Sequence, residues 1–255
     1  MSYSDFKLEI LALTGIDLSL YKEKQMKRRI DALVQRLGCA GYEQYVRLLK
    51  HDPKALEFFC DYITINVTAF FRTPEHWERL CREVLPHLEQ PRVWSVACST
   101  GQEPYSLVMA LAEHYPLEDI HVYATDINEK VLDIARRGIY KTEELDGVPQ
   151  DYLDRYFEEA AGGYRVRDEV RRCVEFHRMN LLDPQLEMER EKFDLVVCRN
   201  VLIYFTTEAK RQLINLFLRS LKPGGILFTG KAEQILYYAQ HGFDKICNWL
   251  YKKIN

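Results

Sequence analysis

The chain has 255 residues, of which 47% are hydrophobic and 29% charged, proportions that are ordinary for a globular protein of one or two domains. The formal net charge is only −3, so no overall electrostatic field favours nucleic acid or an anionic membrane surface as a partner. No apolar run approaches the roughly 20 residues that span a bilayer, and the start, "MSYSDFKLEILAL", lacks the basic-then-apolar pattern of a signal peptide; the protein is therefore expected to be cytoplasmic.

The first 60 residues carry the periodicity of α-helices. Apolar residues recur there at spacings of three and four, which places them on one helical face. Two such stripes cover residues 6–13 and 30–37, and two shorter helical patterns follow. The predicted helices end near Gly38, Asp52 and residue 62. We therefore expect a helical N-terminal domain, which we place at residues 1–75.

After about residue 90 the pattern changes to short apolar runs separated by helical stretches. The runs are nearly continuous and rich in β-branched and aromatic residues, which is typical of strands buried on both faces. They are "RVWSVAC" (92–98), "HVYATD" (121–126), "FDLVVCR" (193–199) and "GGILFTG" (224–230), and the helical stretches are 103–114, 128–137 and 207–221. This alternation predicts an α/β fold over residues 76–255, with a doubly wound, mostly parallel sheet.

Two segments depart from the alternation. The C-terminal tail, "GFDKICNWLYKKIN", has the pattern of two strands joined by a tight turn near Asn248, so the sheet is expected to gain an antiparallel edge. Residues 143–178 contain a short helix after a proline and then small strands around a turn. We interpret them as an inserted antiparallel β-subdomain, over about residues 143–178, at the rim of the sheet.

Cysteine and histidine are spread along the chain. The seven cysteines include no C-x-x-C pair, and none of the seven histidines falls in an H-x-x-x-H pair. Dispersed cysteines in odd number are typical of reduced thiols, and neither residue type has the spacing of zinc ligands. The sequence predicts an intracellular protein with neither a disulfide nor a metal site.

A strand, a glycine-containing loop and a helix follow one another in "VACSTGQEPYSL" (96–107). This order favours a nucleotide-like ligand at the carboxyl end of the strand. The G-x-G-x-x-G fingerprint for a pyrophosphate is absent, and Glu103 lies where a helix N-terminus would otherwise attract phosphate. An adenosine-like ligand without phosphate, such as S-adenosylmethionine, fits better. The alternative is that Ser99, Thr100 and Glu103 only cap the helix, since T-x-x-E is also a capping-box pattern.

Polar residues also follow two other predicted strands. Asp126 ends the strand at 121–126, where an acid can accept hydrogen bonds from ribose hydroxyls; the alternative is a helix N-cap beside Asn128. Arg199 and Asn200 follow the buried run that begins at Phe193. Because a buried polar group without a partner costs about 1–3 kcal/mol, an internal acid or a ligand must pair with them.

Six motifs in order resemble those of the bacterial chemotaxis receptor glutamate methyltransferases, the CheR family. They are "NVTAFFR", "WSVACSTGQEPYSL", "YATDINEKVLDIARRGIY", "MNLLD", "FDLVVCRNVLIYF" and "LKPGGILFTGKAE". The resemblance covers nearly the whole chain, including "YKEKQMKRRI" near its start. It implies a class I methyltransferase fold of the Rossmann-like type, which uses S-adenosyl-L-methionine and releases S-adenosyl-L-homocysteine. The implied acceptors are glutamate side chains on receptor cytoplasmic helices, which become methyl esters.

The resemblance also implies the residues of the site. In the family, the segment matching "NVTAFFR" enters the cofactor cleft, so Arg72 is expected to hold the methionine carboxylate by a forked contact, with Phe70 and Phe71 packed beside it. Tyr204 matches an aromatic residue close to the transferred methyl group, and with Arg72 it forms the predicted catalytic set. The predicted cofactor-binding residues are Asn66, Thr68, Arg72, Glu103, Asp126, Asn180, Leu181, Arg199 and Asn200.

A local excess of positive charge lies at residues 21–37, with six lysines and arginines against two acids. From composition alone, such a run is a solvated helix face. The family places a basic helix here against acidic receptor helices, which attract it electrostatically. By resemblance, the residues that bind the chemoreceptor cytoplasmic domain are Lys24, Lys27, Arg28 and Arg29. Neither nucleic acid nor membrane insertion is expected, and the chain is expected to be a monomer.

Two features depart from the family's pattern. Members that grip a pentapeptide at the receptor's C-terminus add it as a strand to the small sheet, and they carry a longer loop than "EEAAGGYRVR" (158–167), so tether-independent action is expected here. Lys231 and Ala232, in "GKAE", stand where the family usually has histidine and serine. Two rival functions remain at this stage: a methyltransferase with another acceptor, and a binding module without catalysis.

Overall fold

The structure is a computed structural model that describes residues 1–88 and 91–254. It divides into two compact units, each made of several chain segments. The first unit consists of Met1–Ile65, Asn180–Leu186 and Val201–Ile214; the second consists of Asn66–Met179, Glu187–Asn200 and Asn215–Asn255. Within the described residues, no helix combines the length and apolar character needed to traverse a bilayer.

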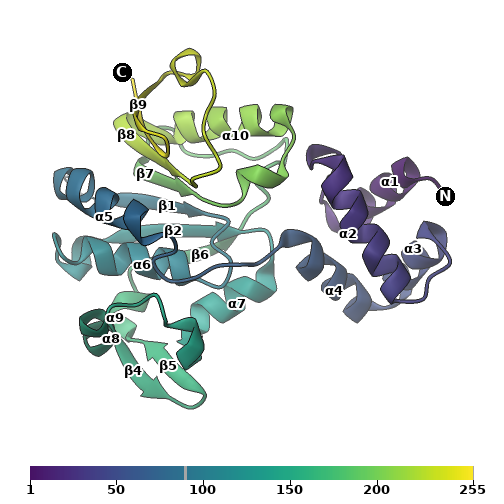
Figure 1. Ribbon diagram of the computed structural model, residues 1–255, viewed down its shortest axis with the longest axis horizontal. Coiled ribbons are helices and arrows are strands. Elements are labelled where there is room, and N and C mark those ends of the chain that lie inside the picture. Colours follow the sequence, from purple (N-terminus) through teal and green to yellow (C-terminus); the bar gives the residue numbers. More distant parts are fainter. Residues whose placement is uncertain (89–90, 255) are drawn as a thin grey trace. The chain divides into compact units, whose positions relative to one another are not determined.

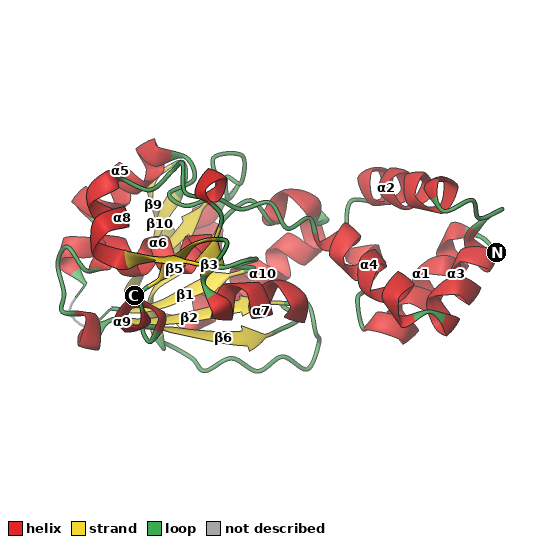
Figure 2. Cartoon of the chain, turned by 90° about the horizontal axis from the view of Figure 1, so that it is seen from below, coloured by secondary structure: helices red, strands yellow, loops and turns green. Residues whose placement is uncertain are grey.

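The N-terminal part of the first unit is helical, and Figure 2 shows only helices and loops there. Its helices are α1 (Tyr3–Thr14), η1 (Leu18–Leu20), α2 (Glu23–Arg36), α3 (Tyr42–His51) and α4 (Pro53–Thr64). Two of them begin at strong caps. Ser2 and Asp5 form a capping box at α1, and Asp52 accepts a hydrogen bond from the amide of Lys54 at α4. The predicted N-terminal helices are confirmed.

Aromatic side chains form the core of these helices. The ring centroid of Phe6, on α1, lies 4.9 Å from that of Tyr42 and 6.3 Å from that of Tyr45, both on α3. Phe59, on α4, meets Phe6 edge-on at 6.2 Å. Phe6, Tyr45 and Phe59 are fully buried, so this cluster supplies much of the apolar burial that holds three helices together.

A seven-stranded sheet forms the centre of the second unit, in the order β6-β2-β1-β7-β8-β10-β9 (Figure 1). The five strands from β6 to β8 are parallel, and β10 runs antiparallel to both of its neighbours. The strands are β1 (Arg92–Val96), β2 (His121–Asp126), β6 (Val174–Arg178), β7 (Phe193–Cys198), β8 (Leu221–Thr229), β9 (Phe243–Cys247) and β10 (Leu250–Lys253). The predicted mostly parallel sheet with an antiparallel edge is confirmed.

Helices cover both faces of this sheet. Ser95 of β1 donates a hydrogen bond to Glu103 of α6, whereas the neighbouring Trp94 packs its ring against Phe217 of α10 at 5.8 Å. Successive side chains of a strand point to opposite faces, so α6 and α10 lie on opposite sides. The helices are α5 (Pro74–Glu83), α6 (Gln102–Leu111), α7 (Glu129–Arg137) and α10 (Thr207–Ser220).

A second, three-stranded antiparallel sheet has the order β3-β5-β4. Its strands are β3 (Ile139–Tyr140), β4 (Phe157–Ala160) and β5 (Gly163–Val166), with α8 (Gln150–Tyr156) before β4 and α9 (Asp168–Arg171) after β5. The inserted antiparallel sheet is therefore present. Residues 174–178, predicted as part of it, instead form β6 and pair in parallel with β2. Because β6 is an edge strand with exposed polar residues, its sequence does not resemble the buried strands.

Candidate functional site

The topology of the main sheet marks one place for a ligand. From β1 the chain runs outward through β2 and β6, and then returns to β7 on the other side of β1. In doubly wound sheets, ligands bind at the carboxyl ends of the two strands where the order reverses in this way. The candidate site is therefore built on the loops that follow β1 and β7, in the second unit.

Both of these loops contain strained backbone. Ala97 and Ser99 after β1, and Asn200 after β7, have positive φ angles of 54°, 52° and 62°. Such conformations cost about 1–3 kcal/mol each in residues other than glycine and gather at functional sites. Gly101, at φ 95°, has a packing reason instead: a Cβ there would lie 2.8 Å from the Cβ of Ala135 on α7.

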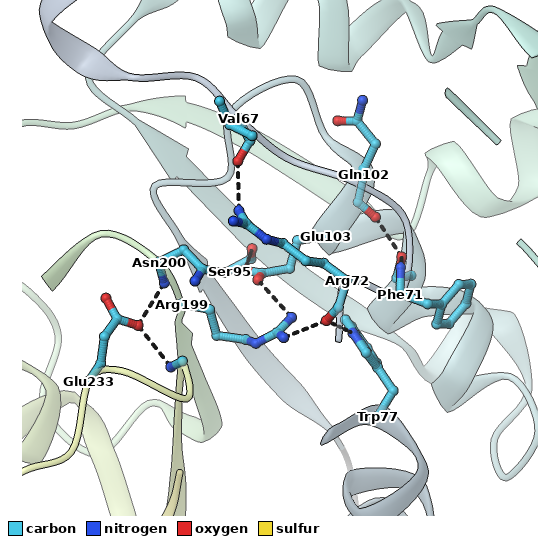
Figure 3. Close-up of polar contacts among 12 residues, drawn as sticks. Val67, Phe71, Arg72, Trp77, Ser95, Gln102, Glu103, Arg199, Asn200 and Glu233 are labelled. Atoms are coloured by element: carbon cyan, nitrogen blue, oxygen red, sulfur yellow. Dashed lines mark hydrogen bonds and ion pairs between the residues drawn. The ribbon is translucent and has the colours of Figure 1, made fainter. Parts of the chain in front are cut away.

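A buried ion pair lies beneath the loops. Glu103 accepts a hydrogen bond of 2.9 Å from the Ser95 hydroxyl, and its other oxygen lies 3.6 Å from Nη1 of Arg199 (Figure 3). Burial raises the pKa of Glu103 to about 7, although Arg199 and Ser95 both act to lower it. The N-cap of α6 is Gly101, and no side chain caps it. The capping-box alternative for Glu103 is therefore wrong, and its carboxylate is directed at the sheet.

Arg199 is buried among several neighbouring residues. Its Nη2 donates a 2.5 Å hydrogen bond to the carbonyl of Arg72, and its guanidinium lies 4.7 Å from the ring of Phe228 and 5.6 Å from that of Trp77. The indole of Trp77 donates to the same carbonyl at 3.1 Å (Figure 3). The Arg199 Nε is buried and makes no hydrogen bond, at a cost of about 1–3 kcal/mol that a polar ligand could offset.

The segment Asn66–Arg72 is anchored by its aromatic pair. The ring of Phe70 meets those of Tyr140 and Phe157, on the small sheet, at 5.0 and 5.6 Å. The amide of Phe71 donates to the hydroxyl of Ser106 at 3.1 Å. Phe70 is 1% and Phe71 9% exposed, so the pair fixes the backbone from which the polar residues of the segment project.

Those polar residues are partly exposed. The Arg72 guanidinium donates to the carbonyl of Val67 at 2.9 Å (Figure 3). The side chains of Asn66 and Thr68 make no hydrogen bond to any part of the chain that the structure describes. All three side chains thus keep hydrogen-bonding capacity for a ligand.

Asp126 connects the loops after β1 and β2. One carboxylate oxygen accepts a 2.9 Å hydrogen bond from the amide of Ser99, and the other accepts a 3.0 Å bond from the amide of Asn128. Asp126 is 6% exposed, and burial raises its pKa. The N-cap of α7 is Asn128, whose side chain accepts from the amide of Lys130; the N-cap alternative for Asp126 is therefore wrong. The nearby Ser99 hydroxyl is buried without a hydrogen-bond partner.

Glu233 contributes to this region and was not predicted. One of its oxygens accepts hydrogen bonds from the amides of Asn200, at 2.6 Å, and Gly230, at 2.8 Å (Figure 3). It thereby ties the loop after β7 to the loop after β8. Asp126 was predicted because it is an acid at the carboxyl end of a strand. Glu233 follows the carboxyl end of β8, so the same criterion could have predicted it.

Three of the predicted catalytic and cofactor-binding residues belong to the first unit. Asn180 has both ends of its amide engaged: it accepts from the amide of Leu182 at 3.1 Å and donates to the carbonyl of Gly15 at 3.1 Å. Leu181 follows it and is half-buried. Tyr204 ends the short helix η5 (Leu202–Tyr204).

A backbone clasp holds Tyr204 against the start of α2. We use this name for residues 20–22 together with residues 204–206. The amide of Lys22 donates to the carbonyl of Tyr204 at 2.8 Å, and the amide of Thr206 donates to that of Leu20 at 2.9 Å. Between them, Tyr21 and Phe205 form an antiparallel bridge, with ring centroids 4.9 Å apart. The predicted aromatic residue and the basic helix therefore share one compact unit.

The four predicted cations of α2 have different surroundings. Lys27 pairs with Asp31 at 2.7 Å, and Arg29 donates to the carbonyl of Tyr62 at 2.5 Å. Lys24 and Arg28 are exposed and make no hydrogen bond or ion pair with the described residues. Because they are spaced i, i+4, they lie on one face of the helix. The positive charges on this face are therefore available to bind an acidic partner.

Two family models together match almost the whole chain. A model described as "CheR methyltransferase, all-alpha domain" matches residues 1–64, and one described as "CheR methyltransferase, SAM binding domain" matches residues 66–248. A chemotaxis protein methyltransferase of Listeria monocytogenes is 39% identical over 244 residues, covering 94% of this chain and 92% of the relative. The Escherichia coli chemotaxis protein methyltransferase is 37% identical over 227 residues, with coverages of 86% and 79%.

Proposed function

From the premise that this chain belongs to the CheR methyltransferase family, we propose that it methylates glutamate side chains on the cytoplasmic helices of chemotaxis receptors. As a member of that family, the chain is a methyltransferase that uses S-adenosyl-L-methionine and releases S-adenosyl-L-homocysteine. The observation that most supports the acceptor is the face of α2 with Lys24 and Arg28, which the backbone clasp joins to Tyr204. A cationic face suits acidic receptor helices.

The residues around the switch point fit the cofactor. The buried Ser99 hydroxyl and Arg199 Nε have no hydrogen-bond partner within the described chain, and polar groups of a ligand would satisfy them. We propose that Asp126 accepts hydrogen bonds from ribose hydroxyls, that Glu103 holds the positively charged end of the amino acid moiety, and that Arg72 holds its carboxylate. The rest of the proposed set consists of Asn66, Thr68, Asn180, Leu181, Arg199 and Asn200.

The proposed reaction requires alignment more than acid–base catalysis. When bound, the cofactor supplies an electrophilic methyl group on a positively charged sulfur. A glutamate acceptor, with a reference pKa near 4.3, is already ionised at neutral pH, so no general base is needed. We propose that Tyr204 orients the acceptor carboxylate and that Arg72 fixes the cofactor. Such positioning can contribute about 7 kcal/mol or more, and exclusion of water from the carboxylate adds to it.

The product's chemistry tests this proposal. The protein is incubated with methyl-labelled cofactor and the cytoplasmic fragment of a chemoreceptor, and the labelled receptor is then treated with alkali. Glutamyl methyl esters release volatile labelled methanol, which is the expected result. Label that resists alkali would indicate methylation at nitrogen, and an unlabelled receptor would indicate another acceptor or a binding module.

Binding of S-adenosyl-L-homocysteine is expected to tighten as the pH rises from about 6 to about 8, because burial holds the pKa of Glu103 at about 7 in the free protein. A positive ligand group favours the carboxylate form, so binding releases a proton and is stronger where Glu103 is already ionised. Isothermal titration calorimetry over this range, in buffers of different ionisation enthalpy, measures both effects. The Glu103→Gln variant should lose the pH dependence, and the exposed Glu118→Gln variant should keep it. An unchanged slope in Glu103→Gln would exclude this role.

Charge reversal on α2 is expected to weaken the receptor interaction selectively. The Lys24→Glu, Arg28→Glu double variant should raise KM for the receptor fragment by about tenfold at low ionic strength, with an effect that shrinks as salt screens the charges. The dissociation constant for S-adenosyl-L-homocysteine should not change. Lys54→Glu, an exposed charge reversal elsewhere in the first unit, serves as the matched control. Equal changes in KM and in cofactor affinity would contradict this assignment.

We further propose that methylation does not depend on a C-terminal pentapeptide of the receptor. The β4–β5 hairpin pairs Ala160 with Gly163, so only two residues connect its strands, and no longer loop is present there to hold a peptide. Deleting the last residues of the receptor fragment is expected to change the methylation rate by less than about twofold. A drop of tenfold or more would show that the small sheet binds such a tether.

A further inference from the structure

The loop from Lys231 to Tyr237, which follows β8, exposes two large apolar residues that are adjacent in the sequence. Leu236 is 72% and Tyr237 73% exposed, more than any other large hydrophobic residue that the structure describes. Tyr237 also has a φ of 57°, a left-handed conformation that costs a non-glycine residue about 1–2 kcal/mol. Two adjacent exposed apolar residues, one of them in a strained conformation, differ from the single exposed apolar residues found on any protein surface.

Two buried residues of the loop, Glu233 and Ile235, anchor it to the rest of the second unit. Glu233, 4% exposed, accepts the two amide hydrogen bonds described above, and a Cβ on Gly230 would lie 2.4 Å from its carboxylate. Ile235, 5% exposed, donates its amide hydrogen to the hydroxyl of Tyr251 at 3.0 Å. With residues 233 and 235 buried, their exposed neighbours Lys231, Leu236 and Tyr237 are presented in a fixed arrangement.

The anchor also places the loop at the rim of the candidate site. Glu233 joins it to the amide of Asn200, the residue that ends the strained turn after β7 (Figure 3). Lys231 is exposed and makes no hydrogen bond or ion pair with the part of the chain that the structure covers. The charge of Lys231 and the apolar surface of Leu236 and Tyr237 are complementary to a partner segment that carries both acidic and apolar residues.

We propose that the Lys231–Tyr237 loop is a docking surface for the acceptor segment, an acidic amphipathic helix whose apolar side rests on Leu236 and Tyr237 while Lys231 meets its acids. This inference rests on the proposed function, because it takes the glutamate-bearing helix as the occupant. The charge of Lys231 favours an acidic partner. The position beside Asn200 favours the acceptor over a second copy of the chain, since another protein seated there would cover the rim that the acceptor has to cross.

The test compares the Leu236→Ser, Tyr237→Ser double variant with wild type, using methyl-labelled cofactor and a receptor cytoplasmic fragment. We expect KM for the fragment to rise by about tenfold or more, while kcat and the dissociation constant for S-adenosyl-L-homocysteine change less than twofold. Lys231→Glu should raise KM at low salt and lose most of this effect near 0.5 M salt, where charges are screened within about 4–5 Å. Leu8→Ser, at an apolar residue of α1 that is 67% exposed, is the matched control and should behave as wild type.

Unchanged KM in the double variant would overturn the inference. So would an equal loss of cofactor affinity, which would make the loop part of the cofactor site, or a change only in sedimentation, which would make it a contact between copies. If the wild-type protein does not methylate the fragment, the proposed function fails on its own account. Direct binding of the fragment, measured by calorimetry, then decides the inference: weaker binding by the double variant supports it, and equal binding overturns it.

Discussion

An Arg199→Met variant is expected to lose about 3–5 kcal/mol of unfolding free energy at pH 8, because it leaves a buried carboxylate without its cation. Glu103 is the carboxylate concerned, with 13% of its side chain exposed. Its pKa is already raised to about 7, and removal of Arg199, which lowers it, raises it further. An acid whose pKa is higher in the folded than in the unfolded state binds its proton more tightly in the folded state. The unfolding free energy therefore falls as the pH rises toward the folded-state pKa. The loss should therefore be largest above pH 7.

A double variant separates the contribution of the ion pair to stability from that of side-chain packing. Arg199→Met combined with Glu103→Gln removes both charges and should recover more than half of the lost stability, although it should not recover methyl transfer. The three tryptophans, Trp77, Trp94 and Trp249, all lie in the second unit, so urea titration followed by tryptophan fluorescence reports on the relevant part. The exposed Arg190→Met should change stability by less than about 0.5 kcal/mol. A double variant no more stable than Arg199→Met alone would refute the coupling.

The second large effect is expected at Asp126. Its alanine variant should bind S-adenosyl-L-homocysteine about 100-fold more weakly, measured by isothermal titration calorimetry. The affinity falls because the proposed contacts from the ribose hydroxyls to this carboxylate are lost. The hydrogen bonds that Asp126 accepts from the amides of Ser99 and Asn128 are lost as well, so the two loops are held less firmly. Hydrogen bonds to a charged group contribute about 1.5–3 kcal/mol each, and about 2.7 kcal/mol corresponds to a 100-fold change in affinity.

A graded series makes this test specific. Asp126→Asn keeps the shape and one accepting oxygen, so its affinity should lie between those of wild type and the alanine variant. Asp133→Ala removes an exposed acid from the adjacent helix α7 and should leave the affinity unchanged. Full affinity in Asp126→Ala, or a loss confined to KM for the receptor, would show that Asp126 does not hold the cofactor.

The fold could be predicted because its strands and helices have strong periodicity. The buried runs that became β1, β2, β7 and β8 are apolar on both faces. The N-terminal helices carry apolar stripes, and two of them, α1 and α4, begin at side-chain caps. The strand β6 was misassigned because it is an edge strand with one neighbour. Only its first residue, Val174, is buried and three of the other four are exposed, so the local pattern matches a hairpin as well as it matches the rim of a large sheet.

The candidate site was harder to predict, because residue types do not reveal side-chain direction. Glu103 and Asp126 each had a helix-capping alternative that only the observed hydrogen bonds could reject. Lys27 and Arg29 have the same charge as Lys24 and Arg28, yet each is engaged by an acid or a carbonyl of its own unit. These partners are local in space, and nothing in the charge pattern distinguishes the engaged cations from the free ones.

The first unit is built from three separate segments of the chain, and this restricts how such a protein can be truncated or recombined. Its helices hold two short stretches from the second half of the chain, through the clasp at residues 204–206 and through the bond from Asn180 to Gly15. A fragment beginning at residue 66 would leave both stretches without their partners. A chimaera that exchanges only residues 1–65 between relatives would pair them with foreign surfaces. The three segments are therefore expected to be inherited, and to diverge, as one piece.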